Sequence, residues 1–189
     1  MAFGFRPAQA AGAGYNTSGA LEYPIRVSAV ATDIFNGDTV KYTTGTSTTD
    51  WGIEVNTAPL DTADSCGIFV GSRWVDADGN QKWGQYYNGA AGNTEAYAFI
   101  APLTNRIFEI QAAVAWNDNF IGWLNIPTPG SGSTTTGNSG IVIALAAADG
   151  ANAPCKIVGV KRDGKNETSA VTTPIVYVRF IDLAIDQLG

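Results

Sequence analysis

The chain contains no histidine among its 189 residues, which removes the commonest general base and metal ligand of enzyme sites. Without histidine there can be no Ser-His-Asp or Cys-His nucleophile pair and no histidine-ligated zinc. The two cysteines, Cys66 and Cys155, are too few for a four-thiolate metal site, and both lie in apolar, strand-like surroundings. We expect buried free thiols at these positions, and a disulfide bond between them is the alternative.

A second possible site is a calcium-binding loop, because oxygen-bearing side chains recur at every second position near residue 76. Asp76, Asp78 and Asn80 resemble its first half. The sixth position is Gln81, where the loop needs glycine, and the twelfth is Tyr87, where it needs glutamate. A hairpin turn is therefore the favoured interpretation, and we expect neither a metal nor a cofactor.

Paired carboxylates could serve a glycosidase. The candidates are Glu54, Glu95, Glu109 and Asp182. Each lies within or beside a predicted strand, on its polar face, where a single carboxylate is normally just solvated. We expect no catalytic residue, and a hydrolase is the disfavoured class.

Tryptophan side chains could stack on sugar rings, as in a carbohydrate-binding module. Of the five in the chain, Trp51 fits the apolar face of its strand, whereas Trp74 and Trp83 share one predicted hairpin. Packing against a partner protein is the favoured interpretation of this pair, because aromatic residues are enriched in interface cores. Trp74, Trp83 and the nearby Tyr86 are thus the candidate oligomer or partner contact.

Composition limits the partners. The net charge is −6, and only 15% of the residues are charged, against about 25% in ordinary domains. Nucleic acid is a poor partner, since phosphate binding needs a dense cationic face. No apolar run reaches the length of a membrane-spanning helix, and the start lacks the basic and apolar regions of a secretory signal. We therefore expect neither a membrane partner nor secretion.

Short strands dominate the rest of the chain. The predicted strands are 26–31, 38–42, 51–55, 67–75, 81–87, 95–100, 107–111, 141–145, 156–160 and 175–181. The strongest local feature is the hairpin whose turn is 76–80. Short helical turns are expected at 118–124 and 182–188. Such a series of strands with turn signals between them predicts an all-β sandwich or closed barrel.

Three segments stand outside this pattern. The loops 43–49 and 128–140 are rich in Gly, Ser and Thr, and their composition favours flexibility. Residues 1–20 set a few aromatic residues among Gly and Ala without any period. A frayed terminus is one interpretation. The favoured one is an extended arm on a single β-domain formed by 21–189.

The arm would dock on a neighbouring subunit, because its apolar residues have no strand partner suggested by the pattern. Its candidate partner-binding residues are Phe3, Phe5, Arg6, Pro7 and Tyr15. Arg6 would supply a charge-assisted hydrogen bond to a carboxylate or carbonyl group.

Several segments together resemble a known family. Residues 1–7, MAFGFRP, are similar to the opening of small head proteins of tailed bacteriophages that are encoded near the major capsid protein. Further similar segments, in the same order, are 33–40, 67–71, 74–80, 86–89, 95–99, 108–111 and 130–137. The likeness covers residues 1 to 140, and the final third has no matching segment.

The resemblance implies a capsid decoration, or cement, protein. Such proteins bind the outside of the major capsid protein shell, commonly as homotrimers, and stabilise the virion without enzymatic activity. Their folds are small β-sandwiches or β-barrels, of the jelly-roll or β-tulip type. Assembly would take place in the host cytoplasm. The alternatives are a carbohydrate-binding module of the virion and a tail or fibre component.

Overall fold

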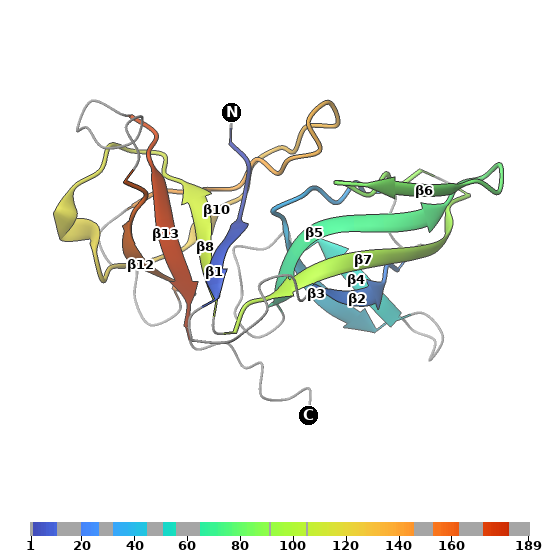
Figure 1. The fold of residues 1–189 in the computed structure, drawn as a ribbon, viewed down its shortest axis with the longest axis horizontal. Helices are drawn as coiled ribbons and strands as arrows, with labels where there is room; N and C mark the ends of the chain where they lie inside the picture. Colours follow the sequence, from blue (N-terminus) through green and yellow to red (C-terminus); the bar gives the residue numbers. More distant parts are fainter. Residues whose placement is uncertain are drawn as a thin grey trace.

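The computed structural model describes most of the chain. The described residues are 2–10, 20–26, 32–44, 51–55, 65–90, 92–104, 106–145, 153–162 and 172–181. They form antiparallel sheets, and the helical structure among them is one short 3-10 turn, η1 (Asp118–Phe120) (Figure 1). The expected all-β class is confirmed, with several antiparallel sheets in an arrangement consistent with a β-sandwich.

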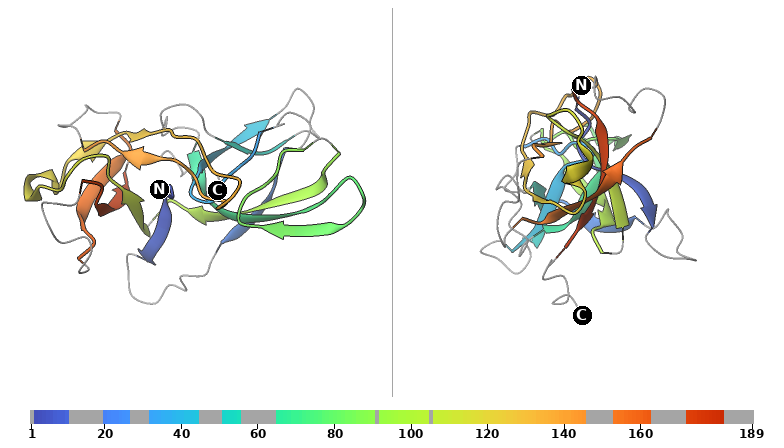
Figure 2. Two further views of the ribbon diagram at one scale, coloured as in Figure 1. Left: turned by 90° about the horizontal axis from the view of Figure 1, so that it is seen from above. Right: turned by 90° about the vertical axis from the view of Figure 1, so that its left-hand side faces the viewer.

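One lobe of the molecule combines the N-terminal strand with the C-terminal half of the chain, and we call it the terminal lobe (Figures 1 and 2). Its sheet has the order β1-β8-β13-β12-β9. The bounds are β1 (Arg6–Ala10), β8 (Arg106–Gln111), β13 (Ile175–Phe180), β12 (Cys155–Val160) and β9 (Leu124–Asn125). A ribbon of β10 (Pro127–Thr128) and β11 (Val142–Ile143) accompanies this sheet. In β13 every second residue is buried, the period of a half-buried strand.

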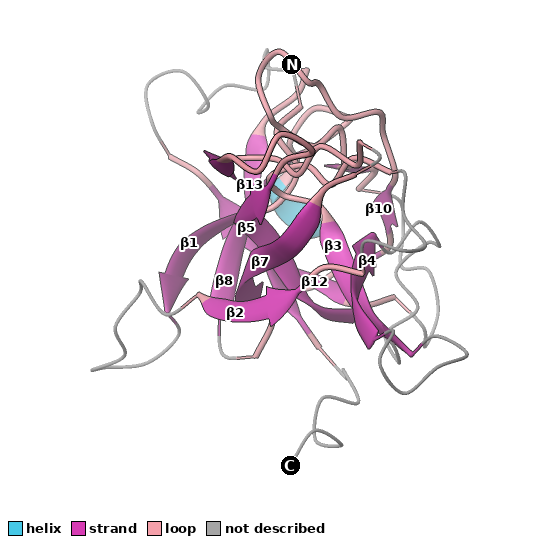
Figure 3. Ribbon diagram, turned by 90° about the vertical axis from the view of Figure 1, so that its right-hand side faces the viewer, coloured by secondary structure: helices cyan, strands magenta, loops and turns pink. Residues whose placement is uncertain are grey.

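The other lobe, which we call the central lobe, is formed by the described residues between 20 and 104 (Figure 1). Its strands follow the order β2-β7-β5-β3-β4, and β6 pairs with the far end of β5. The bounds are β2 (Leu21–Pro24), β7 (Thr94–Pro102), β5 (Ser65–Val75), β3 (Thr39–Thr44), β4 (Trp51–Val55) and β6 (Gln81–Gly84). A bridge between Ile25, which follows β2, and Ile53 in the middle of β4 brings these two outer strands together, so this sheet curls strongly (Figure 3).

Each lobe has its own hydrophobic cluster. The central cluster contains Ile25, Ile34, Val40, Ile53, Phe69, Tyr87, Ala96, Ala98 and Ile100. In the terminal cluster Phe5, Phe108 and Phe180 meet ring against ring, with centroids 5.1 to 6.2 Å apart. Ile68 and Leu103, which come from the central half of the chain, belong to this terminal cluster. The two cores therefore adjoin.

The described part of the N-terminal segment, residues 2–10, is built into the domain. Strand β1 pairs antiparallel with β8, and the side chain of Phe5 is fully buried in the terminal cluster. The expectation that the N-terminal segment lacks a strand partner is therefore wrong for Arg6–Ala10, and the fully buried Phe5 is a core residue rather than an exposed docking anchor. The sequence pattern does not indicate this pairing, because β1 is an edge strand and a bulge between Pro7 and Gln9 interrupts it. Its partner strand also lies about a hundred residues further along the chain.

The loop 128–140, here called the glycine loop, extends from the terminal lobe and contacts the central lobe. It folds back on itself through the bond from the Ser133 N–H to the Asn138 carbonyl (2.9 Å). Asn36 of the central lobe donates to the carbonyl of Gly137 (2.9 Å) and accepts from the N–H of Ser139 (2.8 Å). Figure 1 shows the loop, in orange, crossing the top of the molecule toward the central lobe. Composition alone favoured a flexible loop, and long-range packing gives it a defined place.

Candidate partner-binding surface

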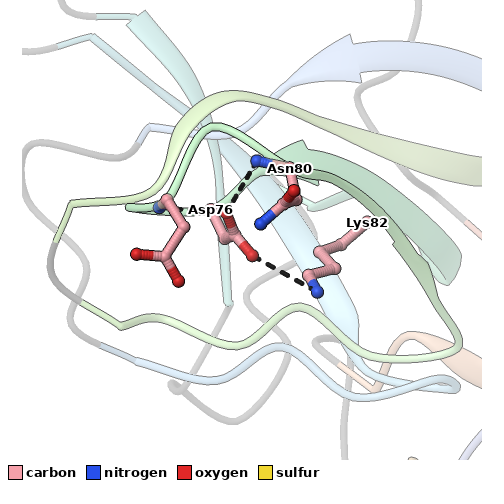
Figure 4. Close-up of polar contacts among 4 residues, drawn as sticks. Asp76, Asn80 and Lys82 are labelled. Atoms are coloured by element: carbon pink, nitrogen blue, oxygen red, sulfur yellow. Dashed lines mark hydrogen bonds and ion pairs between the residues drawn. The ribbon is translucent and has the colours of Figure 1, made fainter.

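The turn of the β5–β6 hairpin is organised by one carboxylate. Oδ1 of Asp76 accepts hydrogen bonds from the N–H groups of Asp78 (3.0 Å) and Asn80 (2.8 Å), and Oδ2 lies 3.3 Å from Nζ of Lys82 (Figure 4). The Asn80 N–H, together with Lys82 and the Asp78 N–H, holds the pKa of Asp76 below its usual range. Both carboxylate oxygens of Asp76 are therefore engaged in contacts that stabilise the hairpin turn. The described residues contain no group of three or more metal-ligating side chains.

The register of this hairpin sends its two tryptophans to opposite faces. Arg73 lies opposite Trp83, and Trp74 lies opposite Lys82, so Trp74 and Trp83 occupy neighbouring pairs of the ladder. Trp74 packs edge-on against Tyr87 with centroids 5.7 Å apart, and it contacts the central cluster. The two tryptophans therefore do not form one surface, because Trp74 turns toward the core.

Trp83 turns outward and remains 64% exposed. Its indole ring lies nearly parallel to the ring of Phe99 on β7, at 13° and a centroid distance of 6.0 Å. Gly71 of the intervening strand β5, with φ of 155°, is paired with Phe99. Since glycine presents no side chain there, the two rings can meet across β5.

A cation completes this surface. The guanidinium of Arg73 lies 4.2 Å from the ring centroid of Tyr97, and its Nε donates to Glu22 of β2. The surface formed by Trp83, Phe99, Tyr97, Arg73 and Glu22 is called the aromatic face. Aromatic residues and arginine are the types enriched at protein interfaces and at their energetic hot spots. The aromatic face therefore has the composition of a partner contact.

The other residues singled out from the sequence are dispersed. The guanidinium of Arg6 covers the ring of Phe3 at 4.2 Å, and its Nη2 donates weakly to Oδ1 of Asn138 (3.5 Å). Pro7 is exposed beside it. Tyr86 stacks on Phe35 at 16° where the glycine loop meets the central lobe. Tyr15 lies outside the described residues.

Tyr97 and Phe99 were not among the partner-binding residues predicted from the sequence, although the alternation in segment 95–100 contains a signal for them. In the segment 95–100, Ala96, Ala98 and Ile100 form the buried face of β7. The residues between them must then face outward, so two aromatic side chains on that outer side are unusual for a solvated face. Arg73 carried no local signal, because its place on this face depends on the pairing of three strands.

The carboxylates considered for catalysis are placed apart. Glu54 pairs with Lys41 in the central lobe (3.4 Å), and Glu109 pairs with Lys161 in the terminal lobe (3.0 Å). Glu95 is exposed at the start of β7. Asp182 lies outside the described residues. Among the described positions, these carboxylates do not converge on a common site.

The two cysteines are free and belong to different lobes. Cys155 is fully buried in the terminal cluster, and burial raises the pKa of its thiol. Cys66 is half-buried, donates to the carbonyl of Val40 (3.4 Å), and has its pKa raised by burial to about 12. The free-thiol interpretation is confirmed, and burial favours the protonated form of both thiols.

The part of the chain that the structure describes contains no helix long and apolar enough to cross a membrane. Comparison with models of known protein families, with curated protein sequences and with solved structures finds no match.

Proposed function

We propose that this chain is a non-enzymatic head decoration protein of a tailed bacteriophage, which binds the outside of the major capsid protein shell and stabilises it. The observation that carries the proposal is the aromatic face, a partly exposed surface of interface composition. The ordered resemblance of residues 1–140 to phage head proteins supplies the choice of partner.

The aromatic face suits a passive contact. Trp83 is held in place by Phe99 before any partner arrives, so little side-chain freedom is lost on binding. Covering a large exposed aromatic side chain contributes roughly 1.5–3 kcal/mol. A homotrimer would present three such faces, and their combined avidity could hold the protein on the shell even if each contact were weak.

Because Phe5 is buried in the core, fewer N-terminal residues remain as candidates for the contact with the capsid. Arg6 and Pro7 remain exposed on β1, and Phe3 is half-buried beneath the Arg6 guanidinium. Among the described N-terminal residues, these three are therefore the candidates for a capsid contact.

The test uses purified capsids that lack the protein and measures the occupancy reached by added variants. Trp83→Ala should weaken binding by about 2 kcal/mol or more, roughly thirtyfold, because a central aromatic anchor is lost. Ile121→Ala in the terminal lobe is the matched control, since Ile121 is 53% exposed and lies far from the aromatic face in the chain. Full occupancy by the Trp83 variant, with its fold intact, would contradict the proposal.

A carbohydrate-binding virion module is the second candidate. Trp83 favours it, because one face of its ring stacks on Phe99 while most of the side chain stays open, as in a sugar platform. A glycan array probed with the isolated protein and with Trp83→Ala separates the two functions. Tryptophan-dependent glycan binding without capsid binding would favour the module. A tail or fibre component would be recognised by its low copy number in the particle.

A further inference from the structure

The dipeptide Asn-Gly occurs twice in the chain, at Asn36-Gly37 and at Asn88-Gly89. Asparagine followed by glycine can cyclise, because the backbone nitrogen of the glycine can attack the amide carbon Cγ of the asparagine side chain. Glycine favours this ring closure, since it has no Cβ to obstruct the ring. Asn36 is half-buried, whereas Asn88 is exposed at the start of the loop that leads to β7. The two sites also differ in their polar contacts.

The attacking nitrogen of Gly89 has a carboxylate beside it. Its N–H donates a hydrogen bond to Oδ1 of Asp33 (3.0 Å), which lies far earlier in the chain. A carboxylate at this distance can accept the proton as the nitrogen attacks. The N–H of Gly37 instead donates to the backbone carbonyl of Phe69 (2.8 Å), which cannot take up a proton near neutral pH. A general base is therefore in place at Gly89 and not at Gly37.

The group under attack at Asn88 is polarised by a backbone donor. Its Oδ1 accepts a hydrogen bond from the N–H of Ala90 (3.1 Å). Negative charge develops on this same oxygen when the nitrogen of Gly89 adds to Cγ, so the Ala90 N–H occupies the place of an oxyanion donor.

The peptide bond between Asn88 and Gly89 is polarised as well. The backbone carbonyl of Asn88 accepts a hydrogen bond from Nδ2 of Asn93, which is itself buried. A hydrogen bond to this oxygen favours the deprotonated form of the peptide group, because the negative charge is shared with the oxygen. The nucleophile, the base and the oxyanion donor thus meet at one dipeptide.

We propose that Asn88-Gly89 is a self-modification site, at which Asn88 deamidates through a succinimide with Asp33 as the general base. The nitrogen of Gly89 forms a bond to Cγ of Asn88 while its proton passes to Asp33. The Cγ–Nδ2 bond then breaks, and the same proton leaves with Nδ2 as ammonia. Water, which reaches the exposed Asn88 side chain, opens the imide at either carbonyl. The product is aspartate or isoaspartate in place of Asn88.

This proposal does not depend on the capsid role, because it concerns a reaction of the chain with itself and water. The test incubates the full chain near neutral pH in water enriched in heavy oxygen. Peptide mapping by mass spectrometry gives the rate at each dipeptide, and an isoaspartyl methyltransferase assay detects isoaspartate. In the folded protein we expect Asn88 to react about tenfold faster than Asn36, or more. In urea, where the contacts are lost, we expect the two rates to be similar.

Two variants with independent effects identify the groups that promote the reaction. Asp33→Asn retains an acceptor for the Gly89 N–H but removes the base, and it should slow deamidation of Asn88 about tenfold or more. The rate should then rise more steeply with pH, because hydroxide has to take the proton. Ala90→Pro removes the donor to Oδ1 and should also slow the reaction. Asp78→Asn makes the same charge change as Asp33→Asn at an exposed turn position and should leave the rate unaltered.

Three results would overturn the proposal. The first is a rate at Asn88 equal to or below that at Asn36 in the folded protein. The second is unchanged or faster deamidation in the Asp33 variant, which would show that this carboxylate only holds the loop in place. The third is an equal loss of rate in the Asp33 and Asp78 variants, which would indicate an effect of overall charge. Melting curves confirm that each variant is folded, and the comparison of the two dipeptides in the unaltered chain needs no substitution.

Discussion

Asp38 is a buried carboxylate at the point where the glycine loop reaches the central lobe, with 7% of its surface exposed. Its Oδ2 accepts a hydrogen bond from the N–H of Phe35 (2.8 Å), and the Ser139 side chain is a second partner. Burial raises the pKa of Asp38 above the ordinary 3.8, against the lowering effect of these two bonds. The folded state therefore holds this proton more tightly than the unfolded state does.

The sign of the resulting pH dependence follows from linkage. The contribution of Asp38 to stability is fully present below the unfolded pKa of 3.8, and it is lost as pH rises through the raised folded pKa. Asp38→Asn should reduce this loss of stability with rising pH and raise the melting temperature at neutral pH, because no charge is then buried. Asp78→Asn, at an exposed turn position, should leave the profile unchanged. A uniform loss of stability at every pH in the Asp38 variant would contradict this prediction.

At the level of single elements, the glycine loop depends on close approach that only glycine allows. A Cβ at Gly132 would lie 2.0 Å from a ring carbon of Phe35. Gly132→Ala should therefore destabilise the protein by about 1–3 kcal/mol, the usual cost of overpacking, as measured by urea unfolding. Gly159→Ala on β12 is the control, since a Cβ there meets nothing within 4 Å. Equal stability of the two variants would show that the loop is not held against Phe35.

The local sequence pattern predicted where the strands lie better than it predicted which segments they pair with. The strands at 51–55, 67–75, 95–100 and 156–160 match the observed ones within two residues, because alternation and turn residues are local signals. The hairpin around Asp76 is also present, although its second strand ends at residue 84 instead of 87. Strand β1 and the glycine loop were misjudged, because their structure comes from contacts with residues far along the chain. The aromatic face was only partly foreseen. Trp83 could be named, and the alternation in β7 carries a local signal for Tyr97 and Phe99, but Arg73 joins them only through strand order.

The whole molecule is elongated, with two lobes side by side (Figures 1 and 2). The aromatic face belongs to the central lobe, and an open groove lined by residues of both lobes, Arg6, Asn36 and Arg106 among them, lies where the lobes meet. The molecule therefore offers an exposed aromatic face and a separate groove on a single framework. A protein that contacts more than one neighbour on a shell would use such an arrangement, since each added contact raises the effective concentration for the next.

That framework depends on the N-terminal residues that tie the lobes together. Phe5 is fully buried against Phe108 and Phe180, and its N–H binds the carbonyl of Gly37 in the central lobe. Phe5→Ala should destabilise the protein by about 3–5 kcal/mol, the usual cost of emptying a buried Phe site. Because the two cores adjoin, we expect calorimetry to show one cooperative transition that this variant moves as a whole. Phe3→Ala is the matched control and should cost much less, since Phe3 is only half-buried beneath Arg6. Two separate calorimetric transitions, or equal melting of the two variants, would show that the N-terminal segment does not join the lobes.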